Sequence, residues 1–257
     1  MGSSREEPYL SIPQLSESDL KLLGQYDTPT ISNVIEVFKV LPQTSGYMDG
    51  RIRACFPEMP PMVGYASTAT FRSGAVPRAG ADYAGLEEQV AKFAEFSQPA
   101  VVVIQDIDSP LVAATFGEVM TTIYKGFGAA GLITSGAARD LDQVRALEFP
   151  CFSDGVICSH GYPQLLNLAV PVNVGGITVH SGDLIHGDTN GVTTIPHEIA
   201  SDVAHACQEF AAAEQVILDY INTGNPTPAG LKEARGECVR MIKALGECVR
   251  AKMTTTA

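Results

Sequence analysis

The feature that most constrains the fold is an unbroken run of apolar residues in the middle of the chain, at residues 100–104. Such a run suits a strand that is covered on both faces, as in a parallel sheet. The polar residues Gln105 and Asp106 follow it directly. A segment with helical spacing then covers residues 118–127 and a second short apolar run covers residues 130–134. This alternation of strand and helix predicts an α/β domain.

Start signals and turn residues divide the rest of this domain into short elements. Ser16 opens a pattern that resembles a capping box, and Asp27 stands two residues before a proline, so each predicts the start of a helix. Gly175 and Gly176 supply the positive φ angles that a tight hairpin turn needs. The remaining expected elements are a strand at 65–72, helices at 86–96 and 141–147, a hairpin at 172–179 and a long helix at 198–221.

The C-terminal part contains the sequence Gly-Glu-Cys-Val-Arg twice, at residues 236–240 and 246–250. Its period of ten residues does not match a heptad, which argues against a coiled coil. Two interpretations of this C-terminal segment remain open: it is a helical arm that packs on a neighbouring subunit, or the repeat is a local duplication without function. The predicted organisation is a flexible N-terminus (1–15), the α/β domain (16–222), and a linker with a C-terminal helical arm (223–257).

Charge and cysteine usage exclude several classes of function. The formal net charge is -12 and no run of Lys or Arg is present, so the chain repels nucleic acid. The six cysteines form no CxxC pair, and the N-terminus is polar. No apolar run approaches the roughly 18 to 20 residues that cross a bilayer. We therefore expect a cytoplasmic protein with free thiols that binds neither nucleic acid nor membrane.

Three motifs in order resemble the RraA-like family. They are Gly-Glu-Val-Met at 117–120, Gly-Leu-Ile-Thr-Ser-Gly-Ala-Ala-Arg-Asp-Leu-Asp at 131–142, and the stretch from 175 to 192 that contains Gly-Gly-Ile-Thr-Val and Ser-Gly-Asp-Leu-Ile-His-Gly-Asp. The family includes the class II 4-hydroxy-4-methyl-2-oxoglutarate/4-carboxy-4-hydroxy-2-oxoadipate aldolases and the regulators of ribonuclease activity. The resemblance covers roughly residues 16 to 210.

The resemblance implies a fold and an assembly. The family fold is an α-β-β-α sandwich that resembles the swivelling phosphohistidine domain, and its members form homotrimers or homohexamers with active sites in subunit clefts. The aldolase signature is an acidic residue, twenty residues, Arg-Asp, two residues and another acid. Here Glu118, Arg139 and Asp140 match this signature. The last place holds the neutral Gln143, which leaves the substrate and the surroundings of the metal open.

The resemblance also implies an activity, that of a class II pyruvate aldolase with oxaloacetate decarboxylase side activity. Such a carbon–carbon lyase must stabilise negative charge on the keto oxygen of a small 2-oxo acid. Asp140 would hold Mg²⁺ or Mn²⁺, and Arg139 would bind the carboxylate or keto oxygen. The backbone N–H groups of Val119 and Met120, which follow Gly117 at a helix start, would bind the substrate carboxylate. Glu118 would orient a water molecule or pass a proton.

Simpler interpretations stand beside this one. An Arg-Asp pair is often a surface ion pair, and Glu118 could merely complement the helix dipole. The alternative function is a non-catalytic regulator that binds a ribonuclease. The five histidines lack zinc spacing, and His186, the best of them for a cleft, is expected to be a structural turn residue. Asp183 and Asp188 are expected to bond nearby backbone N–H groups.

Overall fold

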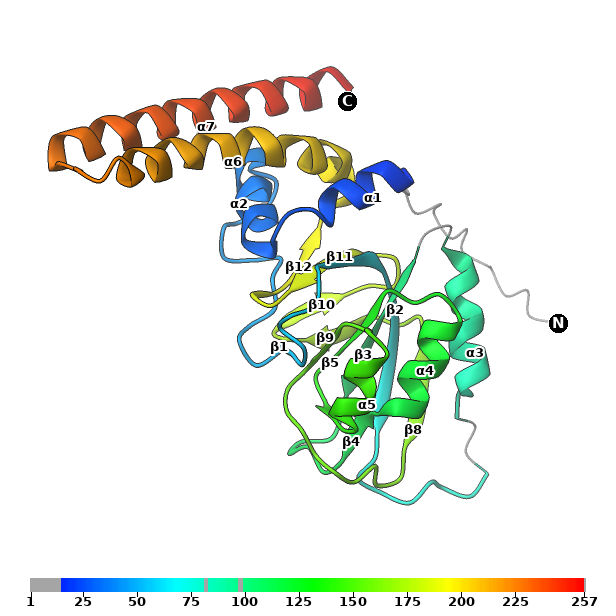
Figure 1. The fold of residues 1–257 in the computed structure, drawn as a ribbon. Helices are drawn as coiled ribbons and strands as arrows, with labels where there is room; N and C mark the ends of the chain where they lie inside the picture. The colour runs from blue at the N-terminus through cyan, green and yellow to red at the C-terminus, as the bar shows by residue number, and fades with distance from the viewer. Residues whose placement is uncertain (1–14, 81–82, 97–98, 257) are drawn as a thin grey trace.

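The computed structural model describes residues 15–80, 83–96 and 99–256. The predicted N-terminal segment 1–15 lies outside the described residues except for Leu15. The described chain forms a mixed α/β body from which a pair of long helices projects (Figure 1). This agrees with the predicted α/β class, whereas the likeness to the phosphohistidine domain stays a prediction.

The elements follow one another along the chain as strands that alternate with mostly short helices. The helices are α1 Glu17–Leu23, α2 Thr28–Phe38, α3 Leu86–Ala91, η1 Lys92–Glu95, α4 Glu118–Gly126, α5 Leu141–Ala146, η2 His197–Ile199, α6 Ala200–Asn222 and α7 Pro228–Thr256. The strands are β1 Arg53–Ala54, β2 Met62–Arg72, β3 Ala100–Asp106, β4 Ala114–Phe116, β5 Gly131–Thr134, β6 Ala137–Ala138, β7 Cys151–Ser153, β8 Gln164–Leu168, β9 Val172–Val174, β10 Ile177–Val179, β11 Leu184–Asp188 and β12 Gly191–Ile195.

Eight of these strands form one sheet that curls into a nearly closed barrel (Figure 1). The order is β1-β7-β5-β3-β2-β11-β12, and β8 pairs with the far end of β2. The central strands β2, β3, β5 and β7 run parallel, whereas β1, β8, β11 and β12 pair antiparallel with their neighbours. Because the central strands are parallel, their carboxyl ends meet at one edge of the sheet.

Strand β3 is covered on both faces, as its unbroken apolar run predicts. Val102 and Ile104 belong to the larger core cluster, which also holds residues of the helices. Val101 and Val103 belong to a second cluster, which includes residues of the hairpin β9–β10. Successive side chains of a strand point to opposite faces, so β3 contributes to both cores. All four valine and isoleucine side chains are fully buried.

The predicted helix starts and the predicted hairpin are confirmed. The Ser16 hydroxyl accepts a hydrogen bond from the Asp19 N–H at 3.1 Å, and the Asp27 carboxylate accepts one from the Thr30 N–H at 2.8 Å. Gly175 and Gly176 have φ angles of 58° and 78° at the hairpin turn. The strand expected at 65–72 begins three residues earlier, at Met62. Antiparallel pairing of residues 62–64 with β11 adds these residues to the strand.

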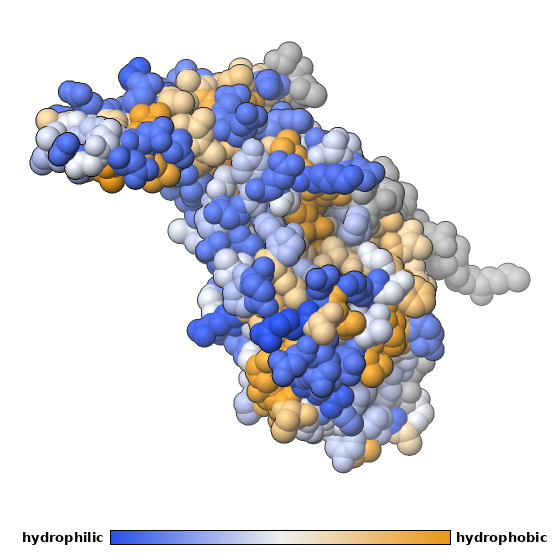
Figure 2. Space-filling view, viewed as in Figure 1, coloured by the Kyte–Doolittle hydropathy of each residue, from blue (hydrophilic) through white to orange (hydrophobic). Residues whose placement is uncertain are grey.

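The two helices α6 and α7 form an antiparallel hairpin that projects from the body (Figure 1). The hairpin leaves several apolar side chains exposed, among them Leu218, Ile221 and Val239. Hydrophobic and hydrophilic residues are interspersed along the face of the hairpin that Figure 2 shows. The near end packs against the body, where the Arg250 guanidinium donates to the Val37 carbonyl at 2.6 Å. No helix among residues 15–80, 83–96 and 99–256 is both long and apolar enough to cross a bilayer. Contact with a neighbouring subunit stays a prediction.

The repeated Gly-Glu-Cys-Val-Arg sequence does not produce a structural repeat within α7. Ten residues of an α-helix turn through roughly 1,000°, about 80° short of three turns, so the two copies face different directions. Cys238 is buried and Val239 is exposed in the first copy, whereas Cys248 is exposed and Val249 is buried in the second. The second copy therefore contributes to the core and the first contributes to the arm.

This difference predicts unequal effects of the same substitution at the two valines. Val249→Ala removes two buried methyl groups from the main core and should lower the free energy of unfolding by about 1–3 kcal/mol. Val239→Ala is the matched control, because its side chain is 64% exposed, and it should change this free energy by less than about 0.5 kcal/mol. Urea unfolding followed by circular dichroism measures both. Equal losses in the two variants would contradict the packing of α7.

A buried histidine connects the N-terminal helices to the sheet. The His186 imidazole lies in β11 and is fully buried, with Nδ1 at 3.0 Å from the Thr28 hydroxyl and Nε2 at 3.2 Å from the Leu23 carbonyl. The Asp188 carboxylate accepts a hydrogen bond from the Thr28 N–H at 2.9 Å. Burial lowers the pKa of His186, although its backbone partners and Asp188 oppose this shift. The ring is thus held neutral between α1, α2 and β11.

The lowered pKa predicts a loss of stability on mild acidification. Above the ordinary histidine pKa of about 6.5 the ring is neutral in the folded and the unfolded chain. Below it the unfolded chain binds a proton that the folded chain resists, so the free energy of unfolding falls as the pH falls. Urea unfolding at pH 7.5 and pH 5.5 should show a smaller pH-dependent loss in His186→Asn than in the unmodified chain. An identical loss in both would show that other groups cause it.

Candidate functional site

The site begins at the start of α4, near the carboxyl ends of the parallel strands. Gly117 is the N-cap residue of this helix and has an extended backbone. The Thr121 hydroxyl donates to the Gly117 carbonyl at 2.9 Å, and the Thr121 N–H donates to the same oxygen at 3.1 Å. The N–H groups of Val119 and Met120 in the first turn have no hydrogen-bond partner among the described residues. These two donors are therefore available at the positive end of the helix dipole.

Arg139 and Asp140 reach this helix start because a short parallel strand pair brings them there. Strand β6 pairs with β4, and the Arg139 N–H donates to the Phe116 carbonyl at 3.1 Å, one residue before Gly117. Asp140 is the N-cap residue of α5 and adopts a left-handed conformation with φ 55° and ψ 40°. Aspartate tolerates this conformation better than most residues do. The turn aims both side chains at the start of α4.

One oxygen of Asp140 joins the two segments. Asp140 Oδ2 accepts a hydrogen bond from the Glu118 N–H at 3.1 Å and lies 3.6 Å from Arg139 Nε. A Cβ on Gly117 would collide with this oxygen and would lie 2.9 Å from Arg139 Cγ. Only glycine permits such a close approach of backbone and side chains. The arrangement leaves the Arg139 side chain 32% exposed and the Asp140 side chain 35% exposed.

A cavity of about 210 Å³ opens beside this contact. Four of the predicted site residues line it, namely Gly117, Val119, Met120 and Arg139. Its other lining residues are Ala114, Thr115, Phe116, His160 and Pro163. Because the cavity is smaller than the roughly 300–1,000 Å³ of typical drug-sized pockets, it suits a small metabolite.

The other two predicted site residues lie next to the cavity without lining it. Asp140 contacts Arg139 and the start of α4, and the exposed Glu118 uses its backbone N–H to bind the Asp140 carboxylate. The structure therefore brings all six predicted residues to one place. The Glu118 N–H binds the Asp140 carboxylate, so only the N–H groups of Val119 and Met120 remain for a ligand.

The carboxylate of Asp140 has the chemistry that suits a divalent cation held mostly by water. Oδ2 accepts the Glu118 N–H and forms an ion pair with Arg139, whereas Oδ1 has no hydrogen-bond partner among the described residues. Within the described part of the chain, no group of three or more His, Cys, Asp or Glu residues could enclose a metal ion. Mg²⁺ commonly keeps several waters and binds through one or two carboxylates, so this donor set fits Mg²⁺ better than a cation that needs a protein cage.

His160 was not predicted as a site residue, yet it lines the same cavity as Arg139. It lies in the connection between β7 and β8, some twenty residues after the Arg-Asp pair, and neither strand was expected from the sequence. Its imidazole Nδ1 lies 2.8 Å from the Gly161 carbonyl. No spacing to another ligand or nucleophile marks this histidine in the sequence, so the fold alone places it in the site.

A buried polar pair lies behind the cavity wall. The Thr115 hydroxyl donates to Asp106 Oδ2 at 3.1 Å, and the Asp108 N–H donates to Asp106 Oδ1 at 3.0 Å. Burial raises the pKa of the Asp106 carboxyl, and both hydrogen bonds oppose the shift. A Cβ on Gly136 would meet Thr115 Oγ1 and Asp106 Oδ2, so the strand ends pack closely here. The cluster of polar residues expected after β3 thus supports the cavity from behind.

The other singled-out residues do not reach this cavity. His186 is buried in β11 and is not a turn residue, which corrects that prediction, although its structural role is confirmed. Asp183 and Asp188 accept hydrogen bonds from the His180 and Asn190 N–H groups, as expected. Gln143 is exposed on α5.

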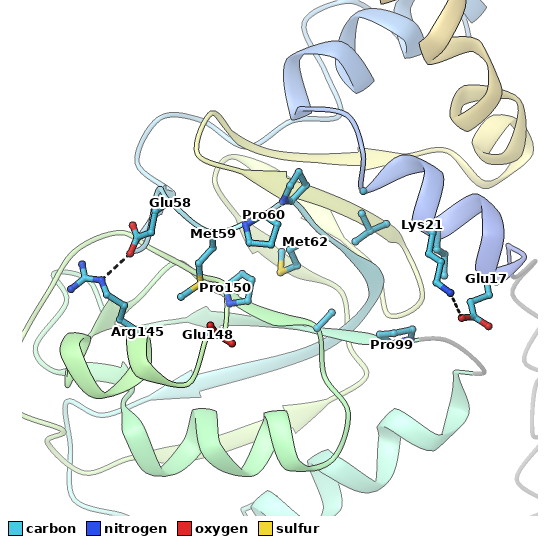
Figure 3. A pocket seen from close by; sticks show the side chains of 15 residues that line it. Glu17, Lys21, Glu58, Met59, Pro60, Met62, Pro99, Arg145, Glu148 and Pro150 are labelled. Carbon is cyan, nitrogen blue, oxygen red and sulfur yellow. Dashed lines mark hydrogen bonds and ion pairs between the residues drawn. The ribbon is translucent and has the colours of Figure 1, made fainter.

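A larger cavity, of about 840 Å³, lies at the opposite end of the parallel strands. Prolines and methionines form much of its wall, and Pro99 and Pro150 directly precede the parallel strands β3 and β7 (Figure 3). Its cations are already paired, Lys21 with Glu17 at 2.6 Å and Arg145 with Glu58 at 2.9 Å (Figure 3). Because both of these cations are paired, this cavity offers less to an anionic ligand than the smaller cavity does.

Comparisons with known proteins identify relatives of this chain. One relative, from Halalkalibacterium halodurans, carries the name "Putative 4-hydroxy-4-methyl-2-oxoglutarate aldolase" and is 36% identical over 120 residues. That match covers 46% of this chain and 57% of the relative. An uncharacterised protein of Methanocaldococcus jannaschii is 31% identical over 112 residues, which cover 43% of this chain and 54% of that protein. The chain thus spans only about half the length of these relatives.

A solved structure shares the fold over most of the chain. The crystal structure of an uncharacterised protein from Pseudomonas syringae pv. tomato superimposes with a TM-score of 0.69 and 24% identity, and covers 90% of this chain and 99% of that one. At this identity the likeness concerns the fold alone. The family model described as Aldolase/RraA matches residues 28–194, which include both motifs of the site. The chain belongs to the RraA-like family.

Proposed function

We propose that this protein is a divalent-metal-dependent lyase that cleaves a carbon–carbon bond of a 2-oxo acid and releases pyruvate. The observation that carries the proposal is the convergence of Arg139, Asp140 and the open first turn of α4 on one small cavity. A cation and two backbone donors beside a carboxylate with a free oxygen form a site for a small anion and a metal ion. The proposed class is a class II pyruvate aldolase with oxaloacetate decarboxylase side activity.

The substrate carboxylate is bound by the backbone N–H groups of Val119 and Met120 and by the guanidinium of Arg139. Arg139 has only Nε near Asp140, at 3.6 Å, so its terminal nitrogens remain for the ligand. These donors are fixed before the substrate arrives, because the helix start and the β4–β6 pair hold them. Fixed donors orient the bound 2-oxo acid for reaction at little entropic cost.

Asp140 would hold the metal ion through its free oxygen. When bound, Mg²⁺ or Mn²⁺ supplies Lewis-acid stabilisation of the charge on the keto oxygen. Glu118, exposed on the first turn of α4, would orient a water molecule or pass a proton. In decarboxylation of oxaloacetate the C3–C4 bond breaks, its electrons form the pyruvate enolate, carbon dioxide leaves, and C3 takes a proton from water.

The names of the relatives support this class and suggest a substrate. Two aligned proteins, from H. halodurans and Pseudomonas fluorescens, carry the name "Putative 4-hydroxy-4-methyl-2-oxoglutarate aldolase". We take this compound as the first substrate to test. We further expect a cytoplasmic homotrimer or homohexamer in which a neighbouring subunit completes the cleft.

Oxaloacetate provides the direct test of the lyase. The purified chain with Mg²⁺ should convert oxaloacetate to pyruvate, EDTA should abolish this turnover, and Arg139→Ala should lower kcat/KM by about 100-fold or more. Arg145→Ala is the matched control, because Arg145 lies at the other cavity and pairs with Glu58. Pyruvate release is followed by a coupled lactate dehydrogenase assay. Turnover that survives EDTA, or that Arg139→Ala leaves intact, would refute the proposal.

The same experiment separates the enzyme from the alternative, a regulator that binds a ribonuclease. A regulator would leave oxaloacetate unchanged at every metal concentration. The acidic net charge of -12 would favour a basic partner, yet it offers no reason for an open helix start beside Arg139. Recovery of a ribonuclease in a pull-down, together with no turnover of any oxo acid, would support the regulator.

A second prediction concerns the close contact at Gly117. The methyl group of Gly117→Ala would displace Asp140 Oδ2 and Arg139, so kcat/KM for oxaloacetate should fall by about 10- to 100-fold with little loss of thermal stability. Gly126→Ala is the control at the other end of the same helix, where a Cβ meets nothing within 4 Å. Steady-state kinetics and thermal unfolding measure both variants. Equal kinetics in the two variants would exclude a role for the contact.

A further inference from the structure

The cavity beside Arg139 contains one lining side chain that is suited to accept a proton. Among its described lining residues, only Thr115, Arg139 and His160 have polar side chains. The Thr115 hydroxyl already donates to Asp106, and a guanidinium stays protonated in proteins. His160 is therefore the one candidate for acid–base chemistry on the cavity wall itself.

Hydrogen bonds hold the backbone on both sides of His160. The Ser159 carbonyl accepts from the Ala114 N–H at 2.7 Å, and the Tyr162 N–H donates to the Ser73 carbonyl at 2.9 Å. Gly161 has φ 51°, and a Cβ there would lie 2.6 Å from the Ser73 carbonyl oxygen. The close approach at this glycine fixes where the preceding histidine lies. An exposed loop residue is thereby held against the strands that carry the site.

The hydrogen bond of the ring determines which nitrogen is free. Nδ1 lies 2.8 Å from the Gly161 carbonyl oxygen, which can only accept, so Nδ1 carries the hydrogen. In the neutral imidazole the lone pair then resides on Nε2. This is the arrangement of a histidine base, with one nitrogen anchored to the backbone and the other available to the substrate.

We propose that His160 Nε2 accepts the proton of the C4 hydroxyl when a 4-hydroxy-2-oxo acid is cleaved. The O–H electrons form the C4 carbonyl, the C3–C4 bond breaks, and its electrons pass to C3 and the keto oxygen as the pyruvate enolate. The enolate takes a proton from water at C3, and the imidazolium returns its proton to solvent. The inference rests on the proposed lyase function and assigns a proton acceptor for the C4 hydroxyl.

Oxaloacetate distinguishes this role from the lyase function itself. Both reactions form the same enolate, but decarboxylation has no hydroxyl to deprotonate. In His160→Gln, cleavage of 4-hydroxy-4-methyl-2-oxoglutarate should fall by about 100-fold or more, the lower end of general base contributions. Decarboxylation of oxaloacetate should fall far less, so the ratio of the two rates drops at least about twentyfold. His205→Gln, an exposed histidine of α6 beside Asp19, should keep the ratio of the unmodified chain.

The tautomer of His160 provides a readout that does not depend on turnover. Long-range ¹H–¹⁵N spectra of the histidine-labelled chain, with His160→Gln to assign the signal, should show hydrogen on Nδ1 and a bare Nε2. Hydrogen on Nε2 would overturn the proposal. So would equal losses of both activities in His160→Gln, or a selective loss of cleavage in Glu118→Gln instead.

The activities of the unmodified chain distinguish a failure of the His160 role from a failure of the lyase function. If it decarboxylates oxaloacetate but does not cleave 4-hydroxy-4-methyl-2-oxoglutarate or its unbranched 4-hydroxy analogue, the role of His160 is refuted and the lyase stands. If it turns over none of these acids, the lyase itself is refuted. Cleavage that depends on His160 while decarboxylation persists supports both.

Discussion

The candidate site depends on the contact between the Asp140 carboxylate and the start of α4. Oδ2 receives the Glu118 N–H at 3.1 Å, and Gly117 supplies the space by having no Cβ. This contact fixes the distance between two segments that are twenty residues apart in the sequence. It also orients the second oxygen of Asp140 and leaves the next two N–H groups open. The parallel pairing of β4 with β6 brings the segments together in the first place.

Much of this arrangement follows from the sequence, because its causes are local. The apolar run of β3 identified a strand buried on both faces, and Ser16 and Asp27 marked helix starts by the bonds that they form. The spacing of Glu118, Arg139 and Asp140 carried the resemblance to the RraA-like family. A helix start and a strand end of such a unit meet at one sheet edge, so their convergence could be expected from chain order.

The parts that escaped prediction depend on contacts between distant segments. Strands β7 and β8 are short and lack alternating patterns, and they exist because β5 and β2 offer partners. His160 reaches the cavity because Ser73 and Ala114 hold its loop. The division of α7 into a packed end and a projecting end could not be read from its repeat, since the burial of Val249 depends on where α2 and α6 lie. Such contacts leave no periodic signal in the sequence.

The loop that carries His160 is held by main-chain groups, since Ser159 contributes its carbonyl and Tyr162 its N–H. The anchoring therefore survives replacement of the imidazole, provided that Gly161 keeps its positive φ angle. The strands and the first turn of α4, by contrast, tolerate little change around Gly117. The residues around Gly117 must therefore stay constant, whereas the side chain at position 160 is free to vary. Under the proposed function, exchange of one loop residue could suit a new leaving group while the residues around Gly117 stay unchanged.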